Sequence, residues 1–521
     1  MENLLIGLST ALMAQNLLAC LAGVFLGTAI GVIPGIGAMA AISLLMPLTF
    51  AMDPTTGIVM LAGVYYGAEY GGSTASILLN LPGTPSNAIT CLDGYPMAQK
   101  GQAGTALFMT TIASFVGGSI GILVLSLLTP VIVKVGMAFG PAEYFAIIVF
   151  CFVAVSTIGG ADPKKNFVMV AIGALMGTVG LDIYDGAERY SFGSHHLIDG
   201  LSLVPVAMGL FGLSEIILSI RHGSEKRPHH KINFASMLPS ARQWKRSFWP
   251  MLRGAASGCF FGPLPGTGPS VATILSYANE KKLSRHPEEF GRGAIEGVAA
   301  PEAANNAAVQ TAFVPTLALA IPGTPTMAIM IGALMIHGII PGPQLMSAEP
   351  QLFWGLVASF WIGNLLLLVI NIPLIGLWVS FLNVPYRLLY PAIIILICVG
   401  CFSLKNSVFD VAVMLVVGIA SYGLRRHGFL PAPLLIGFVL SPMLEENFRR
   451  AMIMGRGEVE FLASSPISIT AWLLTLAMLL SVLYRRQMQK LFMKFITRAG
   501  RDNTSAASGA ATTDTTRTPD Q

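Results

Sequence analysis

Two short stretches of sequence decide how this chain folds, and each of them occurs twice. The first is Gly31-Val-Ile-Pro-Gly-Ile-Gly37, and a related stretch is Gly262-Pro-Leu-Pro-Gly-Thr-Gly268. The second is Leu81-Pro-Gly-Thr-Pro85, with an echo at Ile321-Pro-Gly-Thr-Pro325. The echoes follow in the same order, at offsets of 231 and 240 residues. Two distinct signatures repeated in order, each within apolar surroundings, indicate an internal duplication.

The composition places the duplicated halves in a membrane. Of the 521 residues, 54% are hydrophobic and 11% are charged, and the mean hydropathy is +0.69. An ordinary soluble domain carries about 25% charged residues, so this composition excludes a soluble globular enzyme. It also excludes a disordered chain, a collagen and a disulfide scaffold. The apolar runs are continuous, which excludes the alternating pattern of an outer-membrane β-barrel.

We therefore predict an all-α polytopic membrane protein with about 11–14 membrane segments in two inverted-topology repeats, some of the helices broken or re-entrant. The predicted organisation has five parts: a first membrane repeat at 1–225, a basic cytoplasmic linker at 226–250, a second membrane repeat at 251–465, an extra terminal transmembrane helix at 466–490 and a disordered cytoplasmic tail at 491–521. The long apolar runs include 201–220 and 352–382.

The distribution of basic residues predicts the orientation. Lys and Arg are absent before Lys100, and they cluster at 221–253 and at 485–501. By the positive-inside rule both clusters are cytoplasmic, so the C-terminus is cytoplasmic and the N-terminus periplasmic. Equivalent helices of the two halves then point in opposite directions. One conflict remains, because three arginines fall on the outer side in this topology: Arg449, Arg450 and Arg456.

The Pro-Gly signatures predict breaks inside membrane helices. Pro removes a backbone donor, Gly permits positive φ, and the freed backbone groups must be buried in protein or line a wet cavity. Half-helix N-termini suit anions, and unwound carbonyls suit Na⁺. A simple kink or tight turn is the alternative. Glycines four residues apart, at 23–35 and 63–71, predict closely packed helices.

Small polar residues and two carboxylates, Glu69 and Glu302, crowd around the breaks. An intramembrane carboxylate is a functional candidate by default, although a purely structural pairing is the alternative. We expect the four Pro-Gly breaks to converge and to bind substrate carboxylates through backbone N–H groups and small side chains, with a coupling cation. The candidate substrate- and ion-binding residues are Pro34, Gly35, Gly37, Glu69, Ser73, Thr74, Gly83, Thr84, Ser86, Asn87, Gly266, Thr267, Gly268, Glu302, Asn305, Asn306, Gly323 and Thr324.

Other classes of function find little support in the sequence. There is no phosphate-binding loop with its Lys, and no set of nucleophile, base or metal ligands suggests an enzyme. We expect no catalytic residues, no cofactor and no metal beyond a transported Na⁺. The coupling ion is either Na⁺ or H⁺. The alternative to a carrier is a membrane channel or a structural membrane protein.

The blocks Tyr66–Pro85 and Pro301–Pro325, together with Gly31–Gly37, resemble the large permease subunit of the bacterial tripartite tricarboxylate transporters. The resemblance covers about residues 15–490. It implies a secondary transporter in the inner membrane that imports tricarboxylates or related carboxylates, citrate- or tartrate-like. It also implies a small membrane subunit and a periplasmic solute-binding protein as partners. It implies no set of binding residues.

Overall fold

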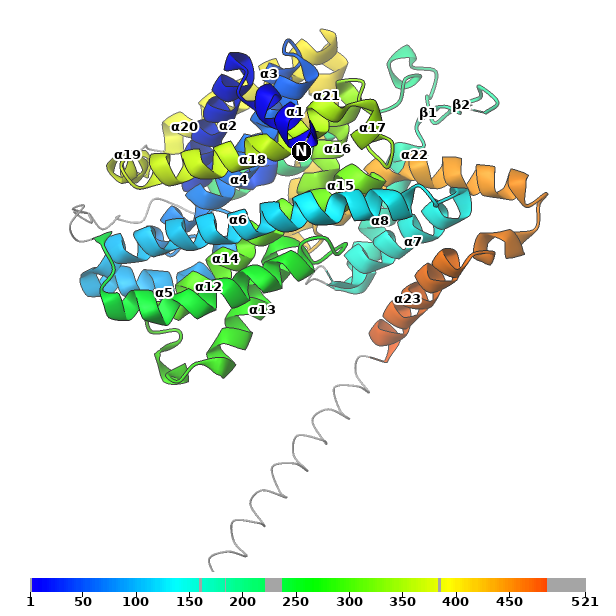
Figure 1. Ribbon diagram of the computed structural model, residues 1–521. Coiled ribbons are helices and arrows are strands. Elements are labelled where there is room, and N and C mark those ends of the chain that lie inside the picture. Colours follow the sequence, from blue (N-terminus) through cyan, green and yellow to red (C-terminus); the bar gives the residue numbers. More distant parts are fainter. Residues whose placement is uncertain (1, 159–161, 183, 221–236, 383–385, 485–521) are drawn as a thin grey trace, which may run out of the picture.

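The computed structural model describes residues 2–158, 162–182, 184–220, 237–382 and 386–484, and the chain is almost entirely helical over these ranges. Six of the helices are long and apolar enough to cross a membrane. The predicted all-α membrane fold is thus confirmed. Several long helices, among them α6, α12, α14 and α18, run alongside one another across the molecule (Figure 1). The predicted tail, and residues 226–236 of the predicted basic linker, lie outside the described residues.

The N-terminal half consists of short and long helices separated by breaks. They are α1 (Glu2–Ala11), α2 (Ala14–Val32), α3 (Gly37–Thr49), α4 (Pro54–Leu79), η1 (Pro85–Ala88), α5 (Thr90–Met97), η2 (Ala98–Gln102), α6 (Ala103–Gly136), α7 (Pro141–Ile158), α8 (Pro163–Gly177), η3 (His195–Leu197), α9 (Leu203–Ala207), η4 (Met208–Leu213) and α10 (Ser214–Ile220), with the paired antiparallel strands β1 (Gly180–Leu181) and β2 (Glu188–Arg189) after α8.

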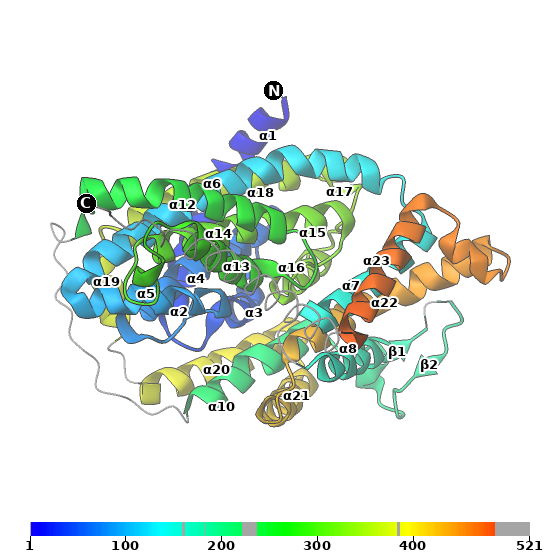
Figure 2. The ribbon, with the colours of Figure 1, turned by 90° about the horizontal axis from the view of Figure 1, so that it is seen from below.

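The C-terminal half has the same general pattern. Its helices are α12 (Ala241–Phe261), α13 (Gly268–Leu283), η5 (Pro287–Glu289), α14 (Glu296–Thr311), α15 (Phe313–Leu319), α16 (Pro325–Ile336), α17 (Leu345–Ala348), α18 (Pro350–Asn371), α19 (Ile375–Phe381), α20 (Tyr386–Lys405), α21 (Val408–Arg426), α22 (Pro431–Met454), η6 (Val459–Ala463) and α23 (Pro466–Leu483). Figure 2 shows α10, α20 and α21 along one edge of the molecule, with α22, α23 and the strands at one end.

Two of the long apolar runs form broken helices. The run at 352–382 forms α18 and then α19, with a turn between them. The run at 201–220 is interrupted by η4, a π-helical segment, whose wider turn accommodates one extra residue. Hydropathy alone cannot detect such breaks, because the interrupted segments stay apolar throughout.

In the first half, α2 and α4 pack with their backbones in direct contact. A methyl group on Gly23, Gly27 or Gly31 would lie 2.2–2.4 Å from a backbone carbonyl oxygen of α4. The three oxygens belong, in the same order, to residues 60, 64 and 68, so the two helices run parallel. Since α3 connects them through short turns, α2 and α3 form a helical hairpin. The close packing predicted from the glycine spacing is confirmed.

The second half repeats this packing at equivalent positions. Gly254 and Gly258 of α12 and the C-cap residue Gly262 contact residues 300, 304 and 308 of α14, again in increasing order. These positions follow Gly23, Gly27 and Gly31 at the offset of 231, and their partners follow at the offset of 240. Helices α12 and α13 therefore form a second hairpin, and equivalent residues of the two halves make equivalent contacts.

The two halves meet where α4 crosses α14. Glu69 contacts Asn305, and four residues later Ser73 contacts Glu302. The residue number rises along α4 while it falls along α14, so these two equivalent helices cross in antiparallel directions. This crossing brings the centres of both halves together.

The three arginines that conflicted with the predicted topology are mostly paired with carboxylates. Arg449 at the end of α22 lies 2.6 Å from Asp182 in the loop after α8 and 2.7 Å from Glu445. Arg189 of β2 bonds the same Glu445 at 2.9 Å. Arg450 pairs with Glu446 at 2.6 Å. These ion pairs fix the β1–β2 hairpin to α22 and neutralise two of the three arginines.

We expect Gly27→Ala to destabilise the protein, because the new methyl would lie 2.4 Å from the Val64 carbonyl oxygen. Overpacking of this kind costs about 1–3 kcal/mol. Gly423→Ala on α21 is the matched control, since nothing lies within 4 Å of the added methyl. Thermal unfolding of the purified protein measures both. Equal midpoints for the two variants would contradict the backbone contact.

The ion pairs at Asp182 predict a pH dependence. The backbone N–H of Tyr184 and the Arg449 guanidinium lower the pKa of Asp182 below its ordinary value. A depressed carboxyl pKa stabilises the fold above about pH 4 and loses that effect as the pH falls through the folded-state pKa. The midpoint difference between the natural protein and Asp182→Asn should therefore shrink on acidification below about pH 4. A difference that stays constant between neutral and acid pH would refute this role.

Candidate functional site

The Pro-Gly breaks of each half meet one another. Gly266 at the tip of the second hairpin donates its N–H to the Gly323 carbonyl at 2.9 Å. In the first half, a methyl on Gly83 would lie 2.4 Å from the Gly31 carbonyl oxygen and from Gly72 Cα. The backbone groups freed at one break are thus packed against the other break of the same half, as burial in a membrane protein requires.

Left-handed backbone occurs at the breaks, in a pattern that the sequence predicted only in part. At the hairpin tips it falls on Gly35 and Gly37 and on the equivalent Gly266 and Gly268, as expected for glycine. At the Pro-Gly-Thr-Pro breaks it falls on Asn80 and Ala320, three residues before Gly83 and Gly323 respectively, and not on those glycines. The glycines of the second signature, Gly83 and Gly323, therefore do not take positive φ. Close packing explains Gly83 instead.

Glu69 of α4 lies in a cluster of oxygen atoms formed by the first break. Its Oε2 is 2.9 Å from the Thr84 hydroxyl and 2.6 Å from the Ser86 hydroxyl. Thr84 Oγ1 is also 2.7 Å from Ser86 Oγ and 2.6 Å from Asn87 Oδ1. Asn305 of the second half donates its amide to Glu69 at 3.2 Å, while its Oδ1 is buried without a hydrogen-bond partner.

Hydrogen counting shows that this cluster lacks donors. Four oxygen–oxygen contacts of 2.6–2.9 Å join Glu69, Thr84, Ser86 and Asn87. Only the two hydroxyl groups carry hydrogens that can fill these contacts. A carboxylate, two hydroxyls and an amide oxygen therefore approach one another with fewer hydrogens than contacts. Such an arrangement suits an additional proton or a small cation.

Glu302 of α14 lies in a complementary environment. It accepts from Ser73 at 2.7 Å, from Ser114 at 3.3 Å, from the Asn87 amide at 3.4 Å and from the Thr90 hydroxyl. All four donors come from the first half. Each contact has its own hydrogen, so Glu302 is satisfied as an acceptor. Among the described residues, no Lys or Arg forms an ion pair with Glu69 or Glu302.

A residue of the first half also lies beside the Pro-Gly-Thr-Pro break of the second half. The Tyr65 side chain on α4 lies next to Thr324 and Thr326 of the second half. Tyr65 and Asn305 are equivalent positions at the offset of 240, as are Thr84 and Thr324. Thus the side chain at this position of the central helix, α4 in one half and α14 in the other, points toward the Pro-Gly-Thr-Pro break of the other half.

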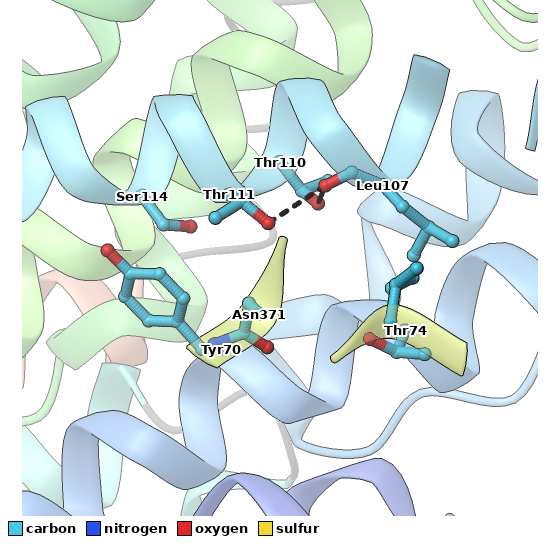
Figure 3. Close-up of a pocket in the computed structure, with 8 residues that line it drawn as sticks. Tyr70, Thr74, Leu107, Thr110, Thr111, Ser114 and Asn371 are labelled. Carbon is cyan, nitrogen blue, oxygen red and sulfur yellow. Dashed lines mark hydrogen bonds between the residues drawn. The ribbon is translucent and has the colours of Figure 1, made fainter. Parts of the chain in front are cut away.

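A small polar pocket adjoins Glu302. It holds about 10 Å³, which is close to the minimum for one water molecule. Figure 3 shows Thr111 and Ser114 along α6, facing Tyr70 and Asn371. Ser114 connects the pocket to Glu302. This pocket is too small for a carboxylate substrate.

The structure brings together seven of the predicted site residues in one hydrogen-bonded network: Glu69, Ser73, Thr84, Ser86, Asn87, Glu302 and Asn305. Thr74 lines the small pocket. The others form the breaks themselves or bond locally. Thr267 donates to its own turn at Leu264, Asn306 bonds the Glu302 carbonyl, and Thr324 caps α16 at Met327.

Sequence reasoning missed four residues of this region: Tyr65, Thr90, Asp93 and Ser114. Thr90 and Asp93 lie within ten residues of the first Pro-Gly-Thr-Pro signature, so proximity to the break was an available signal for both. Ser114 carries no local signal, since it lies within an ordinary apolar run.

The fold and the polar network define a multi-pass helical membrane protein with a buried polar centre, the construction of a membrane transport protein. The chain matches the tripartite tricarboxylate transporter TctA family over residues 17–436, and it belongs to that family. The resemblance to these permeases is thereby confirmed, and the protein is a membrane subunit of this transporter family.

Two similar proteins come from Agrobacterium vitis. One is an uncharacterized 52.8 kDa protein in the TAR-I ttuC' 3' region, 47% identical over 467 residues, which cover 90% of this chain and 93% of that protein. The other is an uncharacterized protein in the TAR-II ttuC' 3' region, 55% identical over 211 residues, or 40% of this chain and 87% of that protein. No solved structure matches the chain.

The two Pro-Gly-Thr-Pro glycines should respond differently to substitution. Gly83→Ala places a methyl 2.4 Å from backbone atoms, whereas Gly323→Ala places its methyl in ordinary contact at 3.6 Å. We expect Gly83→Ala to lose most uptake and to lower the unfolding temperature, while Gly323→Ala retains both. Uptake at equal protein levels and thermal unfolding test this. Equal loss of uptake and of unfolding temperature in the two variants would show that the close backbone contact at Gly83 does not cause the loss.

Proposed function

We propose that this chain is the permease of a secondary active transporter that imports tricarboxylates or related carboxylates, citrate- or tartrate-like, driven by a Na⁺ or H⁺ gradient. The observation that carries the proposal is the donor-poor oxygen cluster at Glu69, held between the two halves. Its position at the crossing of α4 and α14 suits coupling between halves. Membership of a transporter family supports the same reading.

The electrostatics of the site favour co-binding of a cation. Burying two carboxylates with only neutral hydrogen-bond donors around them costs free energy, because a buried charge without a counter-charge is strongly penalised. Glu302 is stabilised by four hydrogen bonds, whereas Glu69 shares its donors with neighbouring acceptors. We therefore assign the coupling ion to Glu69, Thr84, Ser86 and Asn87, with the unpartnered Asn305 Oδ1 as a further ligand.

A carboxylate substrate would be held by backbone N–H groups and small polar side chains near the same breaks. Arg is absent between Ala294 and Pro385, and the break segments contain no Lys or Arg. The N-termini of η1 and α16, which follow the two Pro-Gly-Thr-Pro breaks, offer partial positive charge. An anion with more than one charge then depends on the co-bound cation, so substrate and ion binding should be strongly coupled.

We further propose that the halves are inverted-topology repeats. The antiparallel crossing of equivalent helices and the cross-over of Tyr65 and Asn305 support this arrangement. The proposed setting is the bacterial inner membrane, with a periplasmic N-terminus, a cytoplasmic C-terminus, a small membrane subunit and a periplasmic solute-binding protein. The relatives' location beside ttuC' and the family name are consistent with a carboxylate system.

Reconstituted uptake tests the function directly. Proteoliposomes containing all three components are loaded with buffer and given citrate or tartrate outside, with either a Na⁺ gradient or a pH gradient. Saturable, gradient-driven accumulation supports a carrier. A channel would give flux that follows the substrate gradient alone and does not accumulate substrate, and that result would overturn the proposal.

The two carboxylates should differ under amide substitution. We expect Glu69→Gln to keep the fold but to abolish ion-driven uptake, because the amide removes the negative charge. Glu302→Gln should instead lower stability by about 1–3 kcal/mol, because its NH₂ faces groups that already donate. Glu349→Gln, at an exposed position, is the matched control. Thermal unfolding and uptake are measured together, and normal ion-driven uptake in Glu69→Gln would place the coupling site elsewhere.

A further inference from the structure

Helices α3 and α13 are the second arms of the two hairpins and occupy equivalent positions at the offset of 231. They differ in how they are packed. Arm α3 is covered by α20, η4 and α9. Arm α13 packs on its own α12 and α14 and on η1 of the first half. At equivalent positions, Ile33 is 8% exposed whereas Leu264 is 40% exposed, and Ser43 is 1% exposed whereas Ile274 is 51% exposed. Arm α13 is therefore the less enclosed of the two.

Arm α13 lies against the turn that builds the Glu69 cluster. In the first half it packs against η1, the segment that carries Ser86 and Asn87. The hairpin tip before it carries Gly268, where a methyl would lie 2.8 Å from the Thr324 methyl group. Displacement of α13 would uncover η1, whereas α4 and α14 are held in place by their glycine contacts with α2 and α12.

Asp93 connects this arm to the first half. The side chain of Asp93, on α5, is fully buried. Its Oδ1 accepts the backbone N–H groups of Gly291, Gly293 and Ala294 at 2.9, 2.7 and 2.8 Å. Its Oδ2 accepts the Tyr277 hydroxyl of α13 at 2.9 Å. One carboxylate thus joins α5, the loop before α14 and the arm α13.

The two carboxylate oxygens of Asp93 bind different segments of the chain. The three backbone bonds fix the loop from which α14 begins, and α14 carries Glu302 and Asn305. The single Tyr277 bond is the link to α13. Within its hairpin, α13 is joined to α12 by the bidentate pair of Arg253 with Glu280, at 2.7 and 2.9 Å.

We infer that Asp93 is a positioning residue and that its bond with Tyr277 latches arm α13 over the Glu69 cluster. The inference rests on the proposed function in one respect: the cluster is taken as the ion site that the arm must uncover. Release of the bond leaves the loop before α14 in place, because Oδ1 still holds it. The latch therefore controls access without rebuilding the site.

Hydrogen exchange of the full-length protein in lipid nanodiscs tests the latch. Tyr277→Phe removes only the hydroxyl and keeps the ring beside Phe290, whose centroid is 5.4 Å away. A hydrogen bond to a charged group corresponds to roughly 10-fold or more in an opening equilibrium. We expect exchange in 268–283 and 85–88 to rise on the order of 10-fold, while 291–294 stays protected. Asp93→Ala should raise exchange in all three segments.

Tyr95→Phe, on the same helix as Asp93, is the matched control and should leave exchange unchanged. Exchange of Tyr277→Phe equal to that of Tyr95→Phe would overturn the latch, and so would a rise confined to 291–294. The readout needs no transport, so its outcome is separate from the proposed function. If the latch holds while Glu69→Gln retains ion-driven uptake, the proposed ion site is wrong and the coupling of arm and loop through Asp93 still stands.

Discussion

The constraint on which this structure depends is that a broken helix inside a membrane must satisfy its freed backbone groups within the protein. The chain meets this requirement by packing break against break. Gly266 bonds Gly323 in one half, and Gly83 lies against Gly31 and Gly72 in the other. The glycine contacts between α2 and α4, and between α12 and α14, make this possible because they bring the helix backbones close enough. Polar side chains can then gather at the breaks without facing lipid.

The two carboxylates show how a duplicated framework acquires different chemistry in its two halves. Glu69 and Glu302 occupy non-equivalent positions, since the offset of 240 places Val309 opposite Glu69 and Ala62 opposite Glu302. One carboxylate lies among oxygens that compete for hydrogens, and the other lies among donors. The antiparallel crossing of α4 and α14 brings them into one network through Asn87, which contacts both environments.

Much of this arrangement was predictable from the sequence. The duplicated signatures predicted the breaks and their left-handed tips, the glycine spacing predicted the close packing, and the rarity of intramembrane carboxylates singled out Glu69 and Glu302. What could not be predicted depends on contacts across the two halves. Ser114 differs from other hydroxyl residues only by facing Glu302. Thr90 and Asp93 lie near the first break, but their partners are in the second half, some two hundred residues away. Local periodicity carries no information about such pairs.

The unequal packing of the equivalent helices α3 and α13 affects how firmly the polar centre is closed on each side. Because two equivalent arms flank one polar centre and α3 is more enclosed than α13, the centre is closed more firmly on one side than on the other. The pocket of about 10 Å³ beside Glu302 leaves no room there for a carboxylate substrate. Arm α13 has fewer neighbours to release than α3, and its link to Asp93 is one hydroxyl bond. The same bond pattern keeps the start of α14 fixed, so the arm can open while Glu302 and Asn305 hold their positions.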